Sequence, residues 1–196
     1  MLKNTIPYLI AFFSGLAMMS YEILGVRVLS PSFGGSVYVW GAIIAVFLSG
    51  LGIGYALGGR MADRFPAGVL LRRILLVPTV LILGFPLYGH LLCRMIYGWE
   101  LDSRLGALLV SFNLFFLPCL FIGMVLPVLV KMRAAATGKI GSAAGNISAV
   151  STAGSIVGTL FTSFFLLAWV SVTVGVVLTG GVLGLCWLLA WRADDL

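Results

Sequence analysis

Six long apolar stretches constrain the fold of this chain more than any other feature of its sequence. A membrane-spanning helix needs about 20 mostly apolar residues. Apolar residues make up 61% of the 196-residue chain and charged residues only 9%, which is too few charges to cover a soluble fold. We therefore expect an all-α integral membrane protein, with one transmembrane domain over residues 1–196. Its six predicted spans are residues 6–24, 39–57, 70–92, 105–130, 147–168 and 172–191.

The positive charges predict the orientation of these spans. Nine of the twelve Lys and Arg residues lie at the termini and in the second and fourth connections, whereas Arg27, Arg94 and Arg104 lie on the other side. Because cytoplasmic loops are enriched in Lys and Arg, we expect both termini in the cytoplasm and the spans in the cytoplasmic (inner) membrane. The loops account for the net charge of +6, so we expect the lipid bilayer and no nucleic acid as a partner.

Residues suited to catalysis are scarce. The chain has six acids and one histidine, and Cys93, Cys119 and Cys186 lie far apart without metal-ligand spacing. We therefore expect no metal site, no cofactor and no enzymatic activity.

Two predicted spans carry glycine at every fourth position. The second span has Gly50, Gly54 and Gly58, and the fifth has Gly154 and Gly158. Such a row lets another helix backbone approach closely. Internal helix packing, a dimer face and a sliding surface for a conformational change all remain open uses.

An internal repeat relates these two spans at an offset of 104 residues. The matched pairs are Gly41 with Gly145, Ile43 with Ile147, Ala45 with Ala149, Val46 with Val150, Gly50 with Gly154 and Gly54 with Gly158. A repeat of three spans predicts inverted copies, because three is odd. Inverted three-plus-three repeats build each six-helix half of a major-facilitator transporter, so we expect a bundle of that kind.

The loop Gly59–Arg64 resembles the G-x-x-x-D-R core of the major-facilitator loop between helices two and three. Asp63 and Arg64 would then form a conformational latch at the cytoplasmic side, since Asp can cap a helix and pair with Arg. A capped, positively charged cytoplasmic loop is the alternative interpretation.

Glu22 is an acid inside a predicted span, near the outer end of that span. An ionisable group at membrane depth is costly and is a functional candidate by default. Arg27 is the obvious partner, but five residues along a helix place it about 140° around the axis, so a direct pair needs the helix to loosen at Gly25. A structural Glu–Arg contact, a cation or proton site and an interfacial acid remain open.

Aromatic and amide side chains near Glu22 are candidates for the rest of a ligand site. Tyr21, Tyr38 and Trp40 offer aromatic faces that suit an amine through cation–π contact, and Asn113 is the polar residue of the fourth span. Membrane-interface or packing roles are the alternative for the aromatics.

Two blocks of sequence resemble the membrane region of spermidine-synthase-like membrane proteins. The first block contains Tyr21-Glu22-Ile23, Arg27, Pro31, Phe33-Gly34, Tyr38, Trp40, Gly58-Gly59-Arg60 and Ala62-Asp63-Arg64, and the second contains Ser151-Thr152, Gly154-Ser155 and Gly158-Thr159. The resemblance implies a major-facilitator-like bundle. Fused members add an aminopropyltransferase-like domain, but every glycine-rich stretch here lies in a predicted span or at its end. The resemblance therefore implies a separate aminopropyltransferase-like chain as the source of any such chemistry.

These observations predict a multi-pass protein that binds or passes a small cationic, polyamine-like solute, or docks an aminopropyltransferase-like partner. A half-transporter would need a homodimer or a larger membrane complex to enclose a pathway, with the Gly50 row as a seam. The alternative is a non-catalytic structural or assembly subunit.

Overall fold

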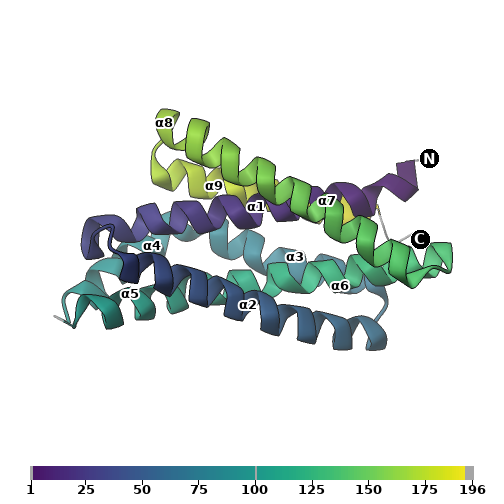
Figure 1. The fold of residues 1–196 in the computed structure, drawn as a ribbon, viewed down its shortest axis with the longest axis horizontal. Coiled ribbons are helices and arrows are strands. Elements are labelled where there is room, and N and C mark those ends of the chain that lie inside the picture. The colour runs from purple at the N-terminus through teal and green to yellow at the C-terminus, as the bar shows by residue number, and fades with distance from the viewer. Residues whose placement is uncertain (1, 100, 193–196) are drawn as a thin grey trace.

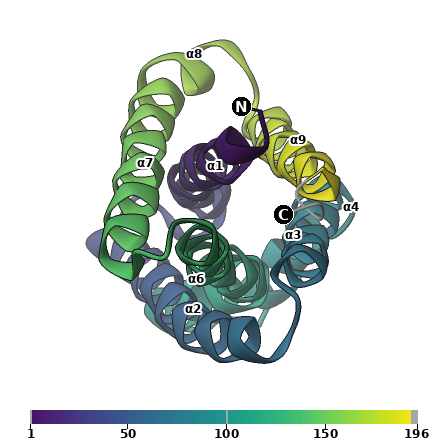
Figure 2. The same cartoon turned by 90° about the vertical axis from the view of Figure 1, so that its right-hand side faces the viewer.

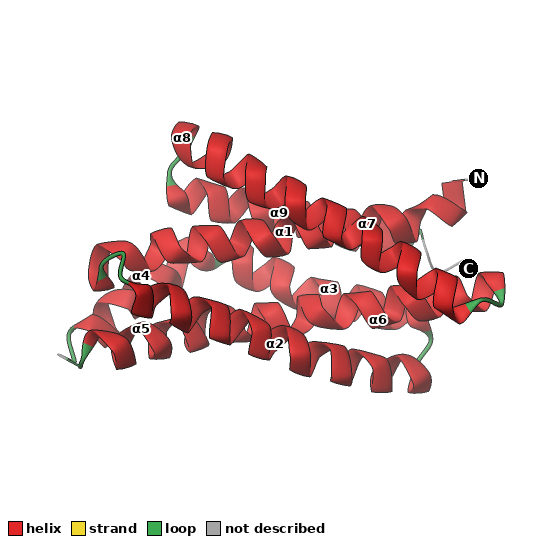
Figure 3. Ribbon diagram, viewed as in Figure 1, coloured by secondary structure: helices red, strands yellow, loops and turns green. Residues whose placement is uncertain are grey.

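The computed structural model describes residues 2–99 and 101–192, and this part of the chain is helical without any strand (Figure 3). Five helical segments are long and apolar enough to cross a membrane, and a bent pair of helices counts as a sixth. The all-helical, multi-pass membrane fold expected from the sequence is thus confirmed. The elements are α1 (Leu2–Phe33), α2 (Val37–Arg64), α3 (Ala67–Leu83), α4 (Phe85–Tyr97), α5 (Ser103–Ser111), η1 (Phe112–Phe116), α6 (Leu117–Thr137), α7 (Ile140–Phe161), η2 (Thr162–Leu166), α8 (Leu167–Trp169) and α9 (Val172–Trp191), where η marks a π-helical turn.

The first helix is longer than the sequence predicts. It continues past residue 24 to Phe33, and Gly34 follows it with a φ of 76°. A left-handed residue ends a helix, and glycine adopts that conformation without steric cost. Glu22 consequently lies about 17 Å along the axis from Phe33. The helix therefore extends well beyond residue 24, the predicted outer end of the span.

The third span is broken. Helices α3 and α4 meet at Gly84 with a bend of 65°. Pro86 follows the break and has no N–H to donate to the carbonyl of Ile82, so a straight helix through this point would lose a hydrogen bond.

Two helices occupy the middle of the bundle (Figure 2). Helix α1 packs on α7 and α9, while α6 packs on α2 and α3, and α3 packs on α9. The start of α1 and the end of α9 lie at one end, together with the α2–α3 and α6–α7 connections, whereas the α1–α2 connection, the end of α4 and the start of α9 lie at the opposite end (Figure 1).

The glycine row of α2 faces α6. Gly50, Gly54 and Gly58 are all buried. A Cβ atom on Gly50 would meet the carbonyl oxygen of Phe116, and a Cβ on Gly54 would meet that of Leu120. This row is therefore occupied within the chain and is not available as the seam of a dimer.

The glycine row of α7 faces α1 in the same way. A Cβ on Gly154 would meet the carbonyl oxygen of Phe12, and a Cβ on Gly158 would meet that of Leu16. Both the glycines and the carbonyls that they approach lie 104 residues from their counterparts in the α2–α6 contact.

Candidate functional site

A hollow of about 330 Å³ lies between α1, α2, α6 and α7, near the middle of each of these helices. Half of its twelve lining residues carry a hydroxyl group. These are Ser14, Tyr55, Ser148, Ser151, Thr152 and Ser155. Polar groups at membrane depth are tolerated where they line a cavity or are bonded internally, so this is the polar interior of the bundle.

The hydroxyl groups retain capacity to accept hydrogen bonds. Ser155 Oγ donates to the carbonyl oxygens of Gly15 (3.3 Å) and Ser151 (3.1 Å), and Ser14 Oγ donates to that of Ala11 (3.2 Å). A hydroxyl that donates its proton in this way still has two lone pairs on its oxygen. The hollow is therefore suited to a ligand with N–H or O–H donors.

Glu22 lies on the face of α1 that lines this hollow. It is half-buried, one turn beyond the lining residues Met18 and Met19, and it forms no hydrogen bond or ion pair with any described residue. A carboxylate inside a span with no cation beside it is suited to a positively charged ligand or to a proton.

Arg27 does not pair with Glu22. Helix α1 runs unbroken through Gly25, which packs against the Phe115 ring, so Arg27 stays on another face and is exposed. Arg27 instead lines a second hollow, of about 340 Å³, together with Trp40. The structural Glu–Arg contact considered from the sequence is absent from the described residues.

Tyr21 is a core residue. Its side chain is fully buried, its hydroxyl donates to the carbonyl oxygen of Leu114 (3.2 Å), and its ring centroid lies 5.1 Å from that of Phe115 and 5.9 Å from that of Phe47. The Tyr21 side chain therefore anchors α1 in the core of the bundle and does not line an accessible site.

Tyr38 and Asn113 lie apart from Glu22. The Arg104 guanidinium stacks 4.3 Å from the Tyr38 ring centroid and donates to its hydroxyl (3.0 Å). Asn113 is exposed, and its side-chain amide donates to a carbonyl one turn earlier in its own span (2.8 Å). Of the six predicted ligand residues, the structure thus brings together Arg27 and Trp40, at a distance from the central hollow.

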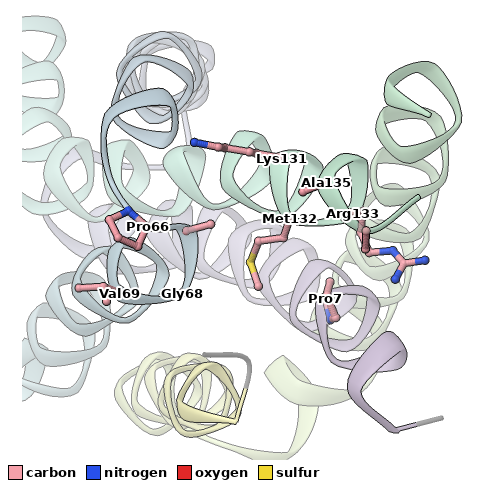
Figure 4. A pocket seen from close by; sticks show the side chains of 10 residues that line it. Pro7, Pro66, Gly68, Val69, Lys131, Met132, Arg133 and Ala135 are labelled. Atoms are coloured by element: carbon pink, nitrogen blue, oxygen red, sulfur yellow. The ribbon is translucent and has the colours of Figure 1, made fainter. Parts of the chain in front are cut away.

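The predicted latch residues Asp63 and Arg64 are exposed and form no hydrogen bond or ion pair within the described part of the chain. The α2–α3 connection is held instead by Lys131, whose Nζ donates to the carbonyl oxygen of Ala62. Lys131 and Arg133 line a hollow of about 500 Å³ at this end, and their charged groups point in opposite directions (Figure 4). The latch stays a prediction.

No group of three or more His, Cys, Asp or Glu side chains gathers in residues 2–99 and 101–192. The three cysteines are buried. The His90 Nε2 atom lies 2.9 Å from the Thr173 hydroxyl. These residues offer no ligand set for a metal within that part of the chain.

The hydroxyl residues of α7 were not predicted as site residues. Ser148, Ser151, Thr152 and Ser155 recur at intervals of three and four, so they share one helix face beside the glycine row. That spacing was visible in the sequence, but it also fits ordinary packing of small residues.

No family model, no curated protein and no solved structure matches this chain.

Proposed function

We propose that the chain binds a small cationic, polyamine-like solute within the membrane, with Glu22 as the charge partner. The position of Glu22 carries the proposal: it lies inside the span, pairs with no described cation and lies one helical turn beyond Met18 and Met19, which line a hollow rich in hydroxyl groups. An amine-bearing solute would supply the charge that this carboxylate lacks.

The lining of the hollow fits the two parts of such a solute. Protonated amines are donors without acceptors, and the hydroxyl oxygens of Ser151 and Ser155 accept hydrogen bonds. The Tyr55 ring offers a cation–π face. Methylene segments between the amines would pack on apolar residues such as Met18 and Ile122, which also line the hollow.

We also propose that the bundle consists of two inverted copies of three spans, as in half of a major-facilitator transporter. The matching contacts of the two glycine rows support this repeat. Two pairs of lining residues also lie 104 residues apart, namely Met18 with Ile122 and Leu51 with Ser155. At the same offset Glu22 corresponds to Leu126, so only one copy would supply a carboxylate.

The proposed orientation places both termini in the cytoplasm and the chain in the cytoplasmic membrane. The termini and the second and fourth connections lie at the same end of the bundle. These segments carry nine of the twelve Lys and Arg residues, and positively charged segments favour the cytoplasmic side.

Docking of a partner is the second candidate function. Only 17% of the most apolar stretch of Ile140–Trp169 is buried by the rest of the chain. A partner helix can cover this face in place of lipid, and the chain would then be a structural or assembly subunit of a larger membrane complex. An aminopropyltransferase-like chain would dock at the end that holds Lys131 and Arg133.

Calorimetric titration of the purified protein with spermidine tests the first candidate. Glu22→Gln should weaken binding about tenfold or more, because hydrogen bonds to charged groups contribute about 1.5–3 kcal/mol. Asp102→Asn is the matched control: it removes one negative charge at a helix N-cap, where Asn serves equally well.

Affinity that survives Glu22→Gln unchanged would contradict the cation site. Stable co-purification with another chain at fixed stoichiometry, with no spermidine binding, would favour the structural subunit.

A further inference from the structure

A fourth hollow, of about 300 Å³, opens at the end of the bundle opposite the termini. It lies between α1, α4 and the start of α9. Its polar and charged lining consists of Arg27, Ser32, His90 and Arg94. Its composition sets it apart from the central hollow, since it has two guanidinium groups and no carboxylate.

No described residue compensates the positive charge in this hollow. Neither Arg27 nor Arg94 forms a hydrogen bond or an ion pair with another described residue, and both side chains are exposed. The third arginine at this end, Arg104, differs because it stacks on Tyr38 and donates to its hydroxyl.

The bend between α3 and α4 lets α4 contribute His90 and Arg94 to this hollow. His90 and Arg94 are four residues apart, so they share one face of α4. Leu87, Leu91 and Met95 form an exposed apolar row beside them. Helix α4 thus has an amphipathic pattern suited to the membrane interface, with its cationic face lining the hollow.

We propose that this hollow binds a phosphate-bearing anion through Arg27 and Arg94, with the Ser32 hydroxyl as a further donor. Two guanidinium groups that line one hollow repel each other, and an anion between them removes that repulsion. The planar guanidinium fork also matches the oxygens of a phosphate group in a bidentate manner. An anionic phospholipid headgroup and a soluble phosphate ester share this chemistry.

Binding to purified protein in a neutral detergent tests the proposal with two probes. Dihexanoylphosphatidylglycerol represents the lipid, and glycerol phosphate represents the soluble ester. The double variant Arg27→Gln/Arg94→Gln should bind the recognised probe about tenfold or more weakly. Arg104→Gln is the matched control, because it removes the same charge at the same end and should retain wild-type affinity.

The two probes distinguish the sources. Binding of the phospholipid alone supports a headgroup site, and binding of glycerol phosphate supports a soluble anion. Failure of the wild-type protein to bind either probe would overturn the proposal, as would an equal loss of affinity in Arg104→Gln. If the double variant does not elute as a folded protein, the single variant Arg94→Gln provides the same comparison. The result is independent of spermidine binding at Glu22.

Discussion

The hydroxyl of Tyr21 donates a hydrogen bond to the carbonyl oxygen of Leu114 across 3.2 Å. In an α-helix this carbonyl would accept from the residue four positions later, which is Pro118, and proline has no N–H. The π-helical turn η1 lies at this point. Tyr21 therefore supplies, from another helix, the donor that the proline removes.

Tyr21→Phe should lower the free energy of unfolding by about 1–2 kcal/mol, because it leaves a buried carbonyl oxygen without this donor. The measurement is the unfolding midpoint on titration of detergent micelles with SDS. Tyr97→Phe is the control, since Tyr97 is 60% exposed and its hydroxyl has no hydrogen-bond partner among the described residues. Equal midpoints for the two variants would show that the Tyr21 hydroxyl adds no stability.

Ser20 links α1 to the second π-helical turn. Thr162 Oγ1 lies 2.8 Å from Ser20 Oγ, and Ser20 Oγ donates to the carbonyl oxygen of Gly158 at 3.4 Å. A double-mutant cycle of Ser20→Ala and Thr162→Val should give a coupling energy of about 0.5–1.5 kcal/mol from the same unfolding titration. Additive effects of the two substitutions would mean that the hydroxyl contact contributes no energy of its own.

Gly54→Ala should destabilise the bundle by about 1–3 kcal/mol, because the added methyl group would collide with the carbonyl oxygen of Leu120 and push α2 away from α6. Gly52→Ala provides the contrast two residues away, where a Cβ meets nothing within 4 Å. The second substitution should be neutral or slightly stabilising, since alanine favours helix formation. Thermal unfolding in detergent distinguishes the two outcomes, and equal midpoints would contradict close packing at Gly54.

Thiol labelling in intact cells tests the orientation. Trp99→Cys introduces an exposed thiol beyond α4, and Ser142→Cys introduces one in the first turn of α7 at the opposite end of the bundle. A membrane-impermeant maleimide should label Trp99→Cys directly and Ser142→Cys only after permeabilisation. The three native cysteines are buried, so they should give little background. The reverse pattern would place the termini outside the cytoplasm.

Hydropathy was sufficient to predict the membrane-spanning helices, because the cost of an unbonded backbone in lipid leaves few alternatives to a helix. The sequence also located the glycine rows, whose regular spacing determines which backbone positions share a face. The predicted first span ended at residue 24, whereas helix α1 continues to Phe33, because a helix can extend beyond the most apolar part of its sequence.

The direction of each side chain was much harder to predict. In a membrane both the lipid-facing and the core-facing surfaces of a helix are apolar, so hydropathy does not separate them. In α9, Leu183 is fully buried whereas Leu178 is 49% exposed, although the residues are identical. For the same reason the sequence did not show that Tyr21 points into the core or that the Ser and Thr residues of α7 line a hollow.

The two glycine rows face inward, where they let α2 approach α6 and α7 approach α1. Each row is buried in a contact between one copy of the proposed repeat and the other. The outward faces of the same helices carry both small residues, such as Ala45 and Ser49 on α2, and bulky ones, such as Phe164 and Trp169 in the α7 span. Enlarging one of the inward glycines should therefore disrupt the six-helix unit itself, whereas changes on the outward faces should leave that unit intact.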